Sequence, residues 1–182
     1  VIAEGEVLQL SKVRDASTTE ETYMEVIRGK TAMLFEASTH SAAALANAQP
    51  EQSEALRLFG DALGIAFQLV DDLLDYRGDA ASLGKNVGDD LAEGKPTLPL
   101  IVTMRDGTPE QASLVRKAIQ QGGSQDLEGI RAAVEAAGAL DYTANLAREY
   151  AARAIDCLKA LPDNEYRAAL TELAEFAVAR TH

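Results

Sequence analysis

Cysteine is almost absent from this sequence, because Cys157 is the only one among 182 residues. A lone thiol cannot form an internal disulfide and has no second thiol for a zinc site, so a reducing, cytoplasmic location is expected. Positive charge is also scarce: 17 Lys and Arg stand against 29 Asp and Glu, a formal net charge of -12. No basic cluster is dense enough to neutralise several phosphates in a row, which argues against nucleic acid as a partner.

Long hydrophobic runs are missing as well. No apolar stretch reaches the roughly 20 residues that span a bilayer, and the first residues, VIAEGEVLQL, lack the order of a signal peptide. Alternating or β-branched runs that would indicate strands are not found. What is present is helical spacing of apolar residues along nearly the whole chain, with 47% hydrophobic and 25% charged residues, as in globular proteins. The sequence therefore predicts one all-α domain covering residues 1–182.

The helical pattern is divided by glycines and prolines. A long helix is expected over 19–48, with Gly29 as a weak point, and a second over 51–77, which begins after Pro50. These two should form the core pair. Between 79 and 95 the apolar pattern fails, which predicts a loop containing one helical turn. Amphipathic helices that we interpret as scaffold are expected over 98–104, 108–121, 125–137, 139–161 and 164–180.

The segment FQLVDDLLDY, residues 67–76, carries the strongest local signal. At about 100° per residue, Gln68, Asp71, Asp72 and Asp75 share one arc of the expected helix, opposite an apolar face. Carboxylates one turn apart repel each other, and the nearby C-terminal end of the helix also disfavours anions. A solvated acidic face is the plainer interpretation, but no Lys or Arg lies one turn away to relieve the repulsion. We favour a bound cation, and Mg²⁺ together with a phosphate-bearing ligand suits carboxylate oxygens.

The loop that follows, GKNVGDDLAEGKPT, adds positive charge. Lys85 and Lys95 stand beside glycines that let the backbone approach an anion, and lysine is a suitable partner for a diphosphate. Asp89, Asp90 and Glu93 repeat the acidic spacing of the preceding helix. Because both lysines are near, we interpret these acids first as ion-paired residues and second as metal ligands.

The tetrapeptide RGKT at 28–31 is similar to the end of a Walker A loop. Met24 stands where the first glycine of that motif belongs, and no strand precedes it, so a nucleotide-binding loop is excluded. Lys30 is then a surface charge unless its helix faces the aspartates.

Four segments carry a resemblance to a known family. They are EGEVLQL at 4–10, GKTAMLFEAS at 29–38, FGDALGIAFQLVDDLLDY at 59–76 and LGKNVGDDLAEGKPTLPL at 83–100. Together they resemble the C-terminal part of the trans-polyprenyl diphosphate synthases, and above all the octaprenyl type. The resemblance implies an isoprenoid-synthase-type helical bundle around a deep cavity, usually a homodimer. It also implies a Mg²⁺-dependent prenyl transfer, in which an allylic diphosphate condenses with isopentenyl diphosphate to a longer all-trans polyprenyl diphosphate.

Matching positions give the acidic residues a role in this chemistry. Asp71, Asp72 and Asp75 resemble the second aspartate-rich metal motif of the family, and Asp89 resembles a water-mediated contact to the metal. The resemblance assigns the diphosphate to Lys30, Lys85 and Lys95.

Two residue pairs resemble family positions close to the reacting carbons. Lys30 and Thr31 match a Lys-Thr pair beside the diphosphate, and Phe67 with Gln68 matches a Phe-Gln pair at the cavity wall. The resemblance therefore makes Lys30, Thr31 and Gln68 the catalytic candidates.

One part of the family pattern is missing. Family members carry a first aspartate-rich motif upstream of the segment at which this chain begins, and the only DDxxD here is at 71–75. We therefore expect a part of a longer enzyme, a bundle incomplete on its N-terminal side, and no turnover by this chain alone. Two other interpretations stay open: a catalytically silent helical subunit that regulates a prenyl synthase, and a terpene cyclase. The retained aspartates and lysines argue against the first, and DDLLD in place of an Asn/Ser/Glu motif argues against the second.

Overall fold

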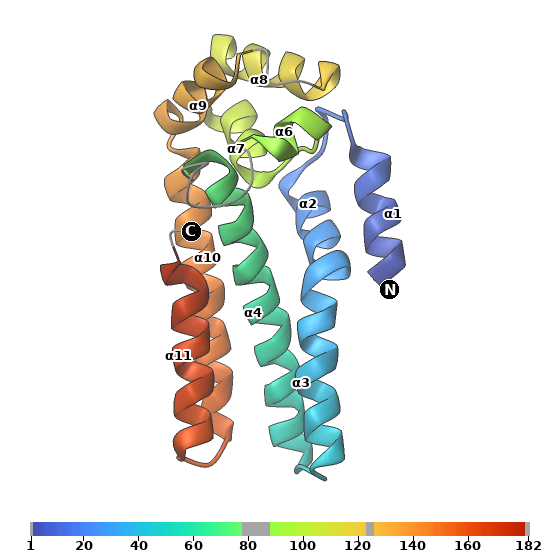
Figure 1. Cartoon of the computed structure of the whole chain (residues 1–182), viewed down its shortest axis with the longest axis vertical. Helices are drawn as coiled ribbons and strands as arrows, with labels where there is room; N and C mark the ends of the chain where they lie inside the picture. The colour runs from blue at the N-terminus through green and yellow to red at the C-terminus, as the bar shows by residue number, and fades with distance from the viewer. Residues whose placement is uncertain (1, 78–87, 123–125, 181–182) are drawn as a thin grey trace.

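The computed structural model describes residues 2–77, 88–122 and 126–180, and every regular element in these ranges is helical (Figure 1). The predicted all-α class is confirmed. No helix in the described ranges has the length and apolar character needed to cross a membrane. Lys85 and the larger part of the expected 79–95 loop lie outside the described residues.

The helices follow the sequence-based expectations closely, with one addition at the start of the chain. α1, Ile2–Lys12, precedes the first helix to which the sequence assigned bounds. The remaining elements are α2 Glu20–Ile27, η1 Arg28–Ala32, α3 Met33–Leu45, α4 Pro50–Arg77, α6 Asp89–Glu93, α7 Leu98–Asp106, α8 Pro109–Gln121, α9 Leu127–Ala136, α10 Ala139–Cys157, η2 Leu158–Ala160 and α11 Glu165–Ala179.

The expected long helix over 19–48 is present, but its middle is modified. Thr19 caps α2, because its side chain accepts a hydrogen bond from the Thr22 amide at 3.3 Å. The chain then passes through η1, a π-helical segment that contains Gly29, and continues as α3. Such π turns inside α-helices are frequent at functional sites. The weak point predicted at Gly29 therefore marks a change of helix type and not a break.

α4 is the central helix of the bundle, with α3 on one side and α10 and α11 on the other (Figure 1). Gly60 and Gly64 let α3 approach closely. A Cβ atom added at Gly60 would lie 2.6 Å from the Phe35 carbonyl oxygen, and one at Gly64 would lie 2.6 Å from the Ala32 Cα. Phe59 on the same helix is fully buried. The expected core pair, 19–48 against 51–77, is thus confirmed.

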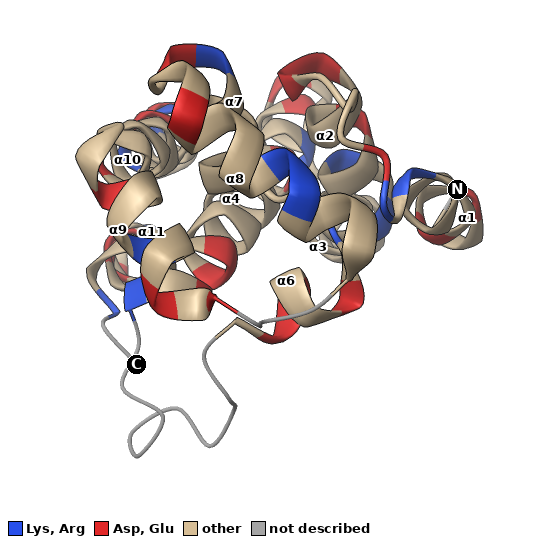
Figure 2. Ribbon diagram, turned by 90° about the horizontal axis from the view of Figure 1, so that it is seen from above, with Lys and Arg blue, Asp and Glu red and all other residues tan. Residues whose placement is uncertain are grey.

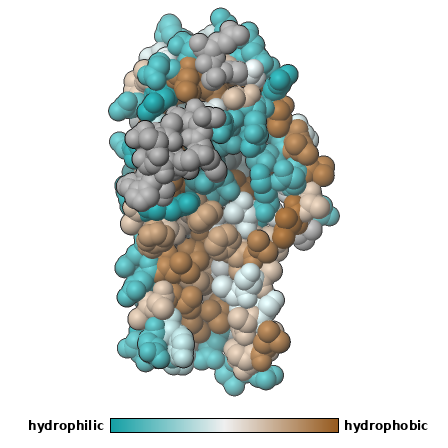
Figure 3. Space-filling model, viewed as in Figure 1, coloured by the Kyte–Doolittle hydropathy of each residue, from teal (hydrophilic) through white to brown (hydrophobic). Residues whose placement is uncertain are grey.

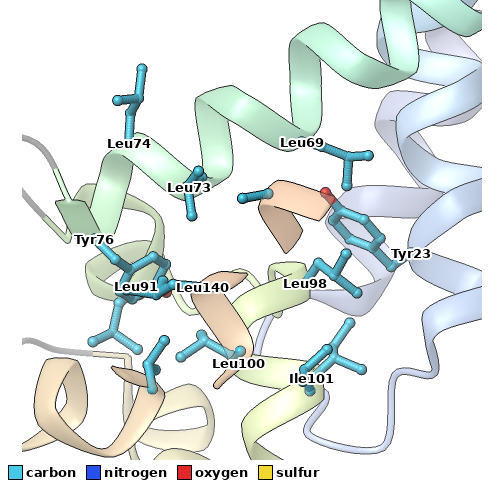
Figure 4. Close-up of a cluster of buried hydrophobic side chains, with 14 of the residues drawn as sticks. Tyr23, Leu69, Leu73, Leu74, Tyr76, Leu91, Leu98, Leu100, Ile101 and Leu140 are labelled. Atoms are coloured by element: carbon cyan, nitrogen blue, oxygen red, sulfur yellow. The ribbon is translucent and has the colours of Figure 1, made fainter. Parts of the chain in front are cut away.

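The C-terminal half of α4 enters a second environment. There, α2, α6 and α7 gather around it, while α8 and α9 cover the end of the molecule (Figure 1). Figure 4 shows Tyr23 of α2, Leu69 of α4 and Leu98 of α7 in one buried cluster at this level. The aspartate arc of α4 therefore lies where several helices from distant parts of the chain meet.

Candidate functional site

A cavity of about 620 Å³ opens beside the C-terminal half of α4. Acidic segments of α4 and α6 are visible at this end of the molecule in Figure 2. The residues that sequence analysis singled out and that line this cavity are Lys30, Gln68, Asp71, Asp72, Asp75, Asp89, Asp90, Glu93 and Lys95. The three aspartates line a cavity that they share with Lys30. Asp72 is buried and Asp71 and Asp75 are half-buried, so a fully solvated acidic face does not describe this arc.

Asp72 is the most deeply buried acid of the cavity, with a side chain only 3% exposed. The Tyr23 hydroxyl donates to its Oδ2 at 2.6 Å, and the Gln68 amide nitrogen donates to its Oδ1 at 2.7 Å. Burial, followed by repulsion from Asp90, raises the pKa of Asp72 to about 7, although the two hydrogen bonds act in the opposite direction. Both oxygens of Asp72 are thus engaged by protein donors.

Asp75 lies one turn further along α4 and is bound differently. Burial and then the charge of Asp90 raise its pKa to about 6, and hydrogen bonds from the backbone at 88–90 lower it in part. Its Oδ2 is buried and has no hydrogen-bond partner among the described residues. A buried carboxylate oxygen without a partner is costly, and a cation in the cavity would satisfy it.

The donor set fits a hard divalent cation that shares its ligands with substrate. Among the described residues, no three or more His, Cys, Asp or Glu side chains are grouped closely enough to hold a metal ion by themselves. Mg²⁺ usually binds to one or two protein carboxylates and completes its octahedron with water and substrate phosphates. The cavity offers carboxylates of this kind at Asp71 and Asp75, next to lysines suited to the phosphates.

Lys95 is held by the acids of α6. Its Nζ lies 2.9 Å from an oxygen of Asp90 and 2.7 Å from an oxygen of Glu93. Although burial lowers the pKa of Lys95, the hydrogen bonds that Lys95 donates to Glu93 and Asp90 raise it above the ordinary value. The expectation that the second acidic cluster is first of all ion-paired is confirmed for Asp90 and Glu93.

Lys30 and Thr31 both belong to the π-helical segment η1, which lies between α1 and α4. Lys30 Nζ donates to Gln9 Oε1 of α1 at 2.6 Å and lies 3.4 Å from a carboxylate oxygen of Glu6. Thr31 points to the other neighbour, because its hydroxyl donates to Gln68 Oε1 at 2.9 Å. Thr31 is not a lining residue of the cavity but supports one that is.

Close packing of α1 against η1 depends on two glycines. A Cβ added at Gly5 would lie 2.6 Å from the Gly29 carbonyl carbon, and one at Gly29 would lie 3.2 Å from the Gly5 Cα. The glycine expected to weaken the helix therefore has a packing role, and it places Lys30 beside α1.

Phe67, which the resemblance placed at the cavity wall, is not among the residues that line the cavity, and its ring contacts Phe35 at a centroid distance of 5.5 Å. Sequence analysis missed its second neighbour, Arg180. The Arg180 guanidinium stands 4.0 Å from the centre of the Phe67 ring and donates to the Phe67 carbonyl at 2.6 Å, and Arg180 also lines the cavity.

Tyr23 was missed by sequence analysis for another reason, since its spacing is that of a core residue and gives no sign of an acidic partner.

Comparison with known proteins identifies the family. Residues 1–137 match the polyprenyl synthetase family. The chain belongs to the polyprenyl synthetase family. It is 55% identical over 181 residues to the octaprenyl diphosphate synthase of Escherichia coli (strain K12), which covers 99% of this chain and 56% of that protein. It is 50% identical over 179 residues to the all-trans-nonaprenyl-diphosphate synthase (geranyl-diphosphate specific) of Rhodobacter capsulatus, covering 98% of this chain and 55% of that protein.

Solved structures of the family share the fold. The polyprenyl synthase of Caulobacter crescentus CB15, crystallised with calcium and isoprenyl diphosphate, superposes with a TM-score of 0.93 at 44% identity. That match covers 100% of this chain and 56% of the other. The chain thus spans about half the length of the relatives that it matches, and the predicted isoprenoid-synthase-type bundle is confirmed for this half.

Proposed function

We propose that this chain is the C-terminal part of a polyprenyl diphosphate synthase of the octaprenyl type. The protein would condense an allylic diphosphate with isopentenyl diphosphate to a longer all-trans polyprenyl diphosphate. The observation that carries the proposal is the cavity that Asp71, Asp75, Lys30 and Lys95 line together, in which one buried oxygen of Asp75 has no hydrogen-bond partner within residues 2–77, 88–122 and 126–180. From the family resemblance we also propose a homodimer in the cytoplasm.

The charged residues of the cavity would bind the metal ion and the diphosphate, and its apolar residues would exclude water. Asp71 and Asp75 would hold Mg²⁺, with Asp89 reaching it through water, and a bound Mg²⁺ supplies positive charge that stabilises the departing diphosphate. Lys30 and Lys95 would contact the diphosphate oxygens, and we propose the same for Lys85, which lies outside the described residues.

Apolar side chains also line the cavity. Val26, Ile27 and Leu74 are among its lining residues, and such side chains would help exclude water from a carbocation formed when the allylic carbon–oxygen bond breaks. Gln68 would place its amide near the reacting carbons, and the Thr31 hydroxyl would hold that amide in position from outside the cavity lining. No side-chain nucleophile is needed for this chemistry, because the double bond of isopentenyl diphosphate attacks the cation.

A catalytically silent regulatory subunit remains the second candidate. It would need no buried, mutually repelling carboxylates, and the raised pKa values of Asp72 and Asp75 show that burying them has a cost. The retained cavity therefore favours the enzyme.

The experiment compares two proteins. One is the 182-residue chain alone, and the other is the same chain joined to the N-terminal part of the Escherichia coli relative that precedes the matched region. Each is incubated with farnesyl diphosphate, labelled isopentenyl diphosphate and Mg²⁺, and long-chain product is extracted. We expect product from the fused enzyme and none from the chain alone, because the first aspartate-rich motif is supplied only in the fusion. A fused enzyme that folds, binds Mg²⁺-diphosphate and gives no product would favour the silent subunit.

A further inference from the structure

A chain of hydrogen bonds runs across the inner wall of the cavity and joins three helical segments. The Tyr23 hydroxyl of α2 donates to Asp72 Oδ2 of α4 at 2.6 Å. The Gln68 amide nitrogen donates to the other oxygen of Asp72 at 2.7 Å, and the Thr31 hydroxyl of η1 donates to Gln68 Oε1 at 2.9 Å. Tyr23, Gln68 and Asp72 all line the cavity.

The chemistry of the groups gives this chain a direction. Both oxygens of Asp72 accept hydrogen bonds, one from Tyr23 and one from Gln68, so Gln68 presents its NH₂ group to this carboxyl. The amide oxygen of Gln68 must then point the other way, toward Thr31. The carboxyl group of Asp72 thus fixes the orientation of the Gln68 amide in the cavity lining.

The contacts of Asp72 differ from those of the acid one turn away. Both Asp72 oxygens have protein donors, and the side chain is almost completely buried. Asp75, in contrast, keeps one buried oxygen that has no hydrogen-bond partner in the part of the chain that the structure describes. A metal at Asp72 would have to displace a short hydrogen bond, whereas a metal at Asp75 would satisfy an open acceptor.

We propose that Tyr23 is a positioning residue of the reaction: its hydroxyl fixes the Asp72 carboxylate, which orients the Gln68 amide and through it the Thr31 hydroxyl. Asp72 accordingly acts within this chain and not as a direct metal ligand. The inference rests on the proposed function for its catalytic consequence, but the hydrogen-bond chain can be tested without turnover.

A matched control is present in the same core. Tyr76 is also a buried tyrosine of the α4 region, and its hydroxyl lies 3.3 Å from Thr97 Oγ1. Tyr76 does not line the cavity, and its hydroxyl pairs with Thr97 and with neither Asp72 nor Gln68. Tyr76→Phe therefore removes a buried hydroxyl without touching the proposed chain.

The first arm uses the ¹⁵N-labelled 182-residue chain. The side-chain NH₂ signal of Gln68, assigned by its loss in Gln68→Met, reports solvent exchange at the amide. Tyr23→Phe should accelerate this exchange by about tenfold, because a hydrogen bond to a charged group has been removed from Asp72. Tyr76→Phe should leave it unchanged. Unaltered exchange in Tyr23→Phe, with a folded spectrum, would overturn the proposal.

The second arm uses the fused enzyme and separates positioning from metal binding. Tyr23→Phe should lower kcat by about tenfold and leave KM and the half-saturating Mg²⁺ concentration unchanged. Asp72→Asn should also lower kcat at unchanged Mg²⁺ dependence, whereas Asp75→Asn should shift the Mg²⁺ dependence. A shift in Mg²⁺ dependence for Asp72→Asn would make Asp72 a metal ligand and contradict the inference. If the unsubstituted fusion forms no product, the proposed function fails while the exchange measurement still decides the positioning chain.

Discussion

Asp71, Asp72 and Asp75 have the same side chain and share one stripe of α4, yet their surroundings differ. Both oxygens of Asp72 accept hydrogen bonds from Tyr23 and Gln68, while one oxygen of Asp75 has no hydrogen-bond partner among the described residues. Local chemistry therefore depends on which helix covers each position, and substitutions in this stripe should have unequal effects.

Removal of Asp71 tests the metal-binding half of the stripe. In the fused enzyme, Asp71→Ala should lower kcat/KM by about 10² to 10³, the usual loss when one preorganised electrostatic contact is removed. Asp90→Ala should do less, because Asp90 is paired with Lys95, which keeps Glu93 as a partner. Steady-state rates with labelled isopentenyl diphosphate measure both. The reverse order would mean that the acids of α6, and not those of α4, hold the metal.

The buried carboxylates should also make stability depend on pH. The pKa of Asp72 is raised from 3.8 to about 7 and that of Asp75 to about 6, chiefly by burial. Between about pH 4 and pH 7 the folded chain therefore binds more protons than the unfolded chain, so stability falls as the pH rises through this window. Below the unfolded value both states are protonated and the effect vanishes.

Urea unfolding of the 182-residue chain at pH 5 and pH 7.5, with chelator present, measures this dependence. Asp72→Asn should flatten it, since the variant has no charge to desolvate. The exposed substitution Glu51→Gln is the control and should leave the slope unchanged. A wild-type chain that gains stability from pH 5 to pH 7.5, with Asp72→Asn behaving identically, would contradict the assignment.

At the scale of elements, the pairing of η1 and α3 with α4 relies on glycine. A Cβ at Gly64 would lie 2.6 Å from the Ala32 Cα and 3.1 Å from the Ala32 Cβ. Backbone atoms cannot move aside as a flexible side chain can. The two helices would have to separate, and with them the η1 segment that carries Lys30 and Thr31.

Gly64→Ala should therefore destabilise the chain although alanine favours helix. The gain in helix propensity is about 1 kcal/mol, whereas overpacking of a tight helix contact costs about 1–3 kcal/mol. Chemical denaturation measures the balance. Ser41→Ala, at an exposed site of α3, should change stability by less than about 0.5 kcal/mol. A more stable Gly64→Ala variant would show that the crossing is looser than the distances indicate.

At the scale of the whole molecule, apolar surface is left uncovered. Apolar side chains gather over the lower middle of the face drawn in Figure 3. At the N-terminal end, α1 buries only Gly5 among its described residues, while Val7 and Leu10 are 65% and 63% exposed. Contiguous apolar patches of this kind usually mark an interface.

We expect the 182-residue chain to self-associate through α1. The double variant Val7→Ser/Leu10→Ser should reduce association in sedimentation velocity at micromolar concentration, and should lower the binding of an apolar dye. Phe176→Ser, at an exposed site of α11, is the control and should do neither. A monomeric wild-type chain without dye binding would contradict the expectation.

The sequence alone determined the helices and the polar arc. Spacing, caps and prolines act over a few residues, so the bounds near Thr19, Pro50 and Thr108 follow from local chemistry, and in the structure Thr108 caps α8. Gln68, Asp71, Asp72 and Asp75 were grouped correctly for the same reason, because helix geometry fixes their relative directions. The shared motifs also indicated the family.

Only the tertiary structure decided what each polar side chain touches. Tyr23 and Asp72 are 49 residues apart, and Phe67 and Arg180 are 113 apart, so no local pattern links either pair. The π turn at Arg28–Ala32 is likewise decided by packing, since α1 and α4 press on it from two sides. The way the helices pack then determines that the Asp72 carboxyl has hydrogen-bond donors at both oxygens and that Asp75 has, among the described residues, one oxygen without a donor. These properties depend on how distant helices exclude water from one another, and the order of residues along a single helix does not contain that information.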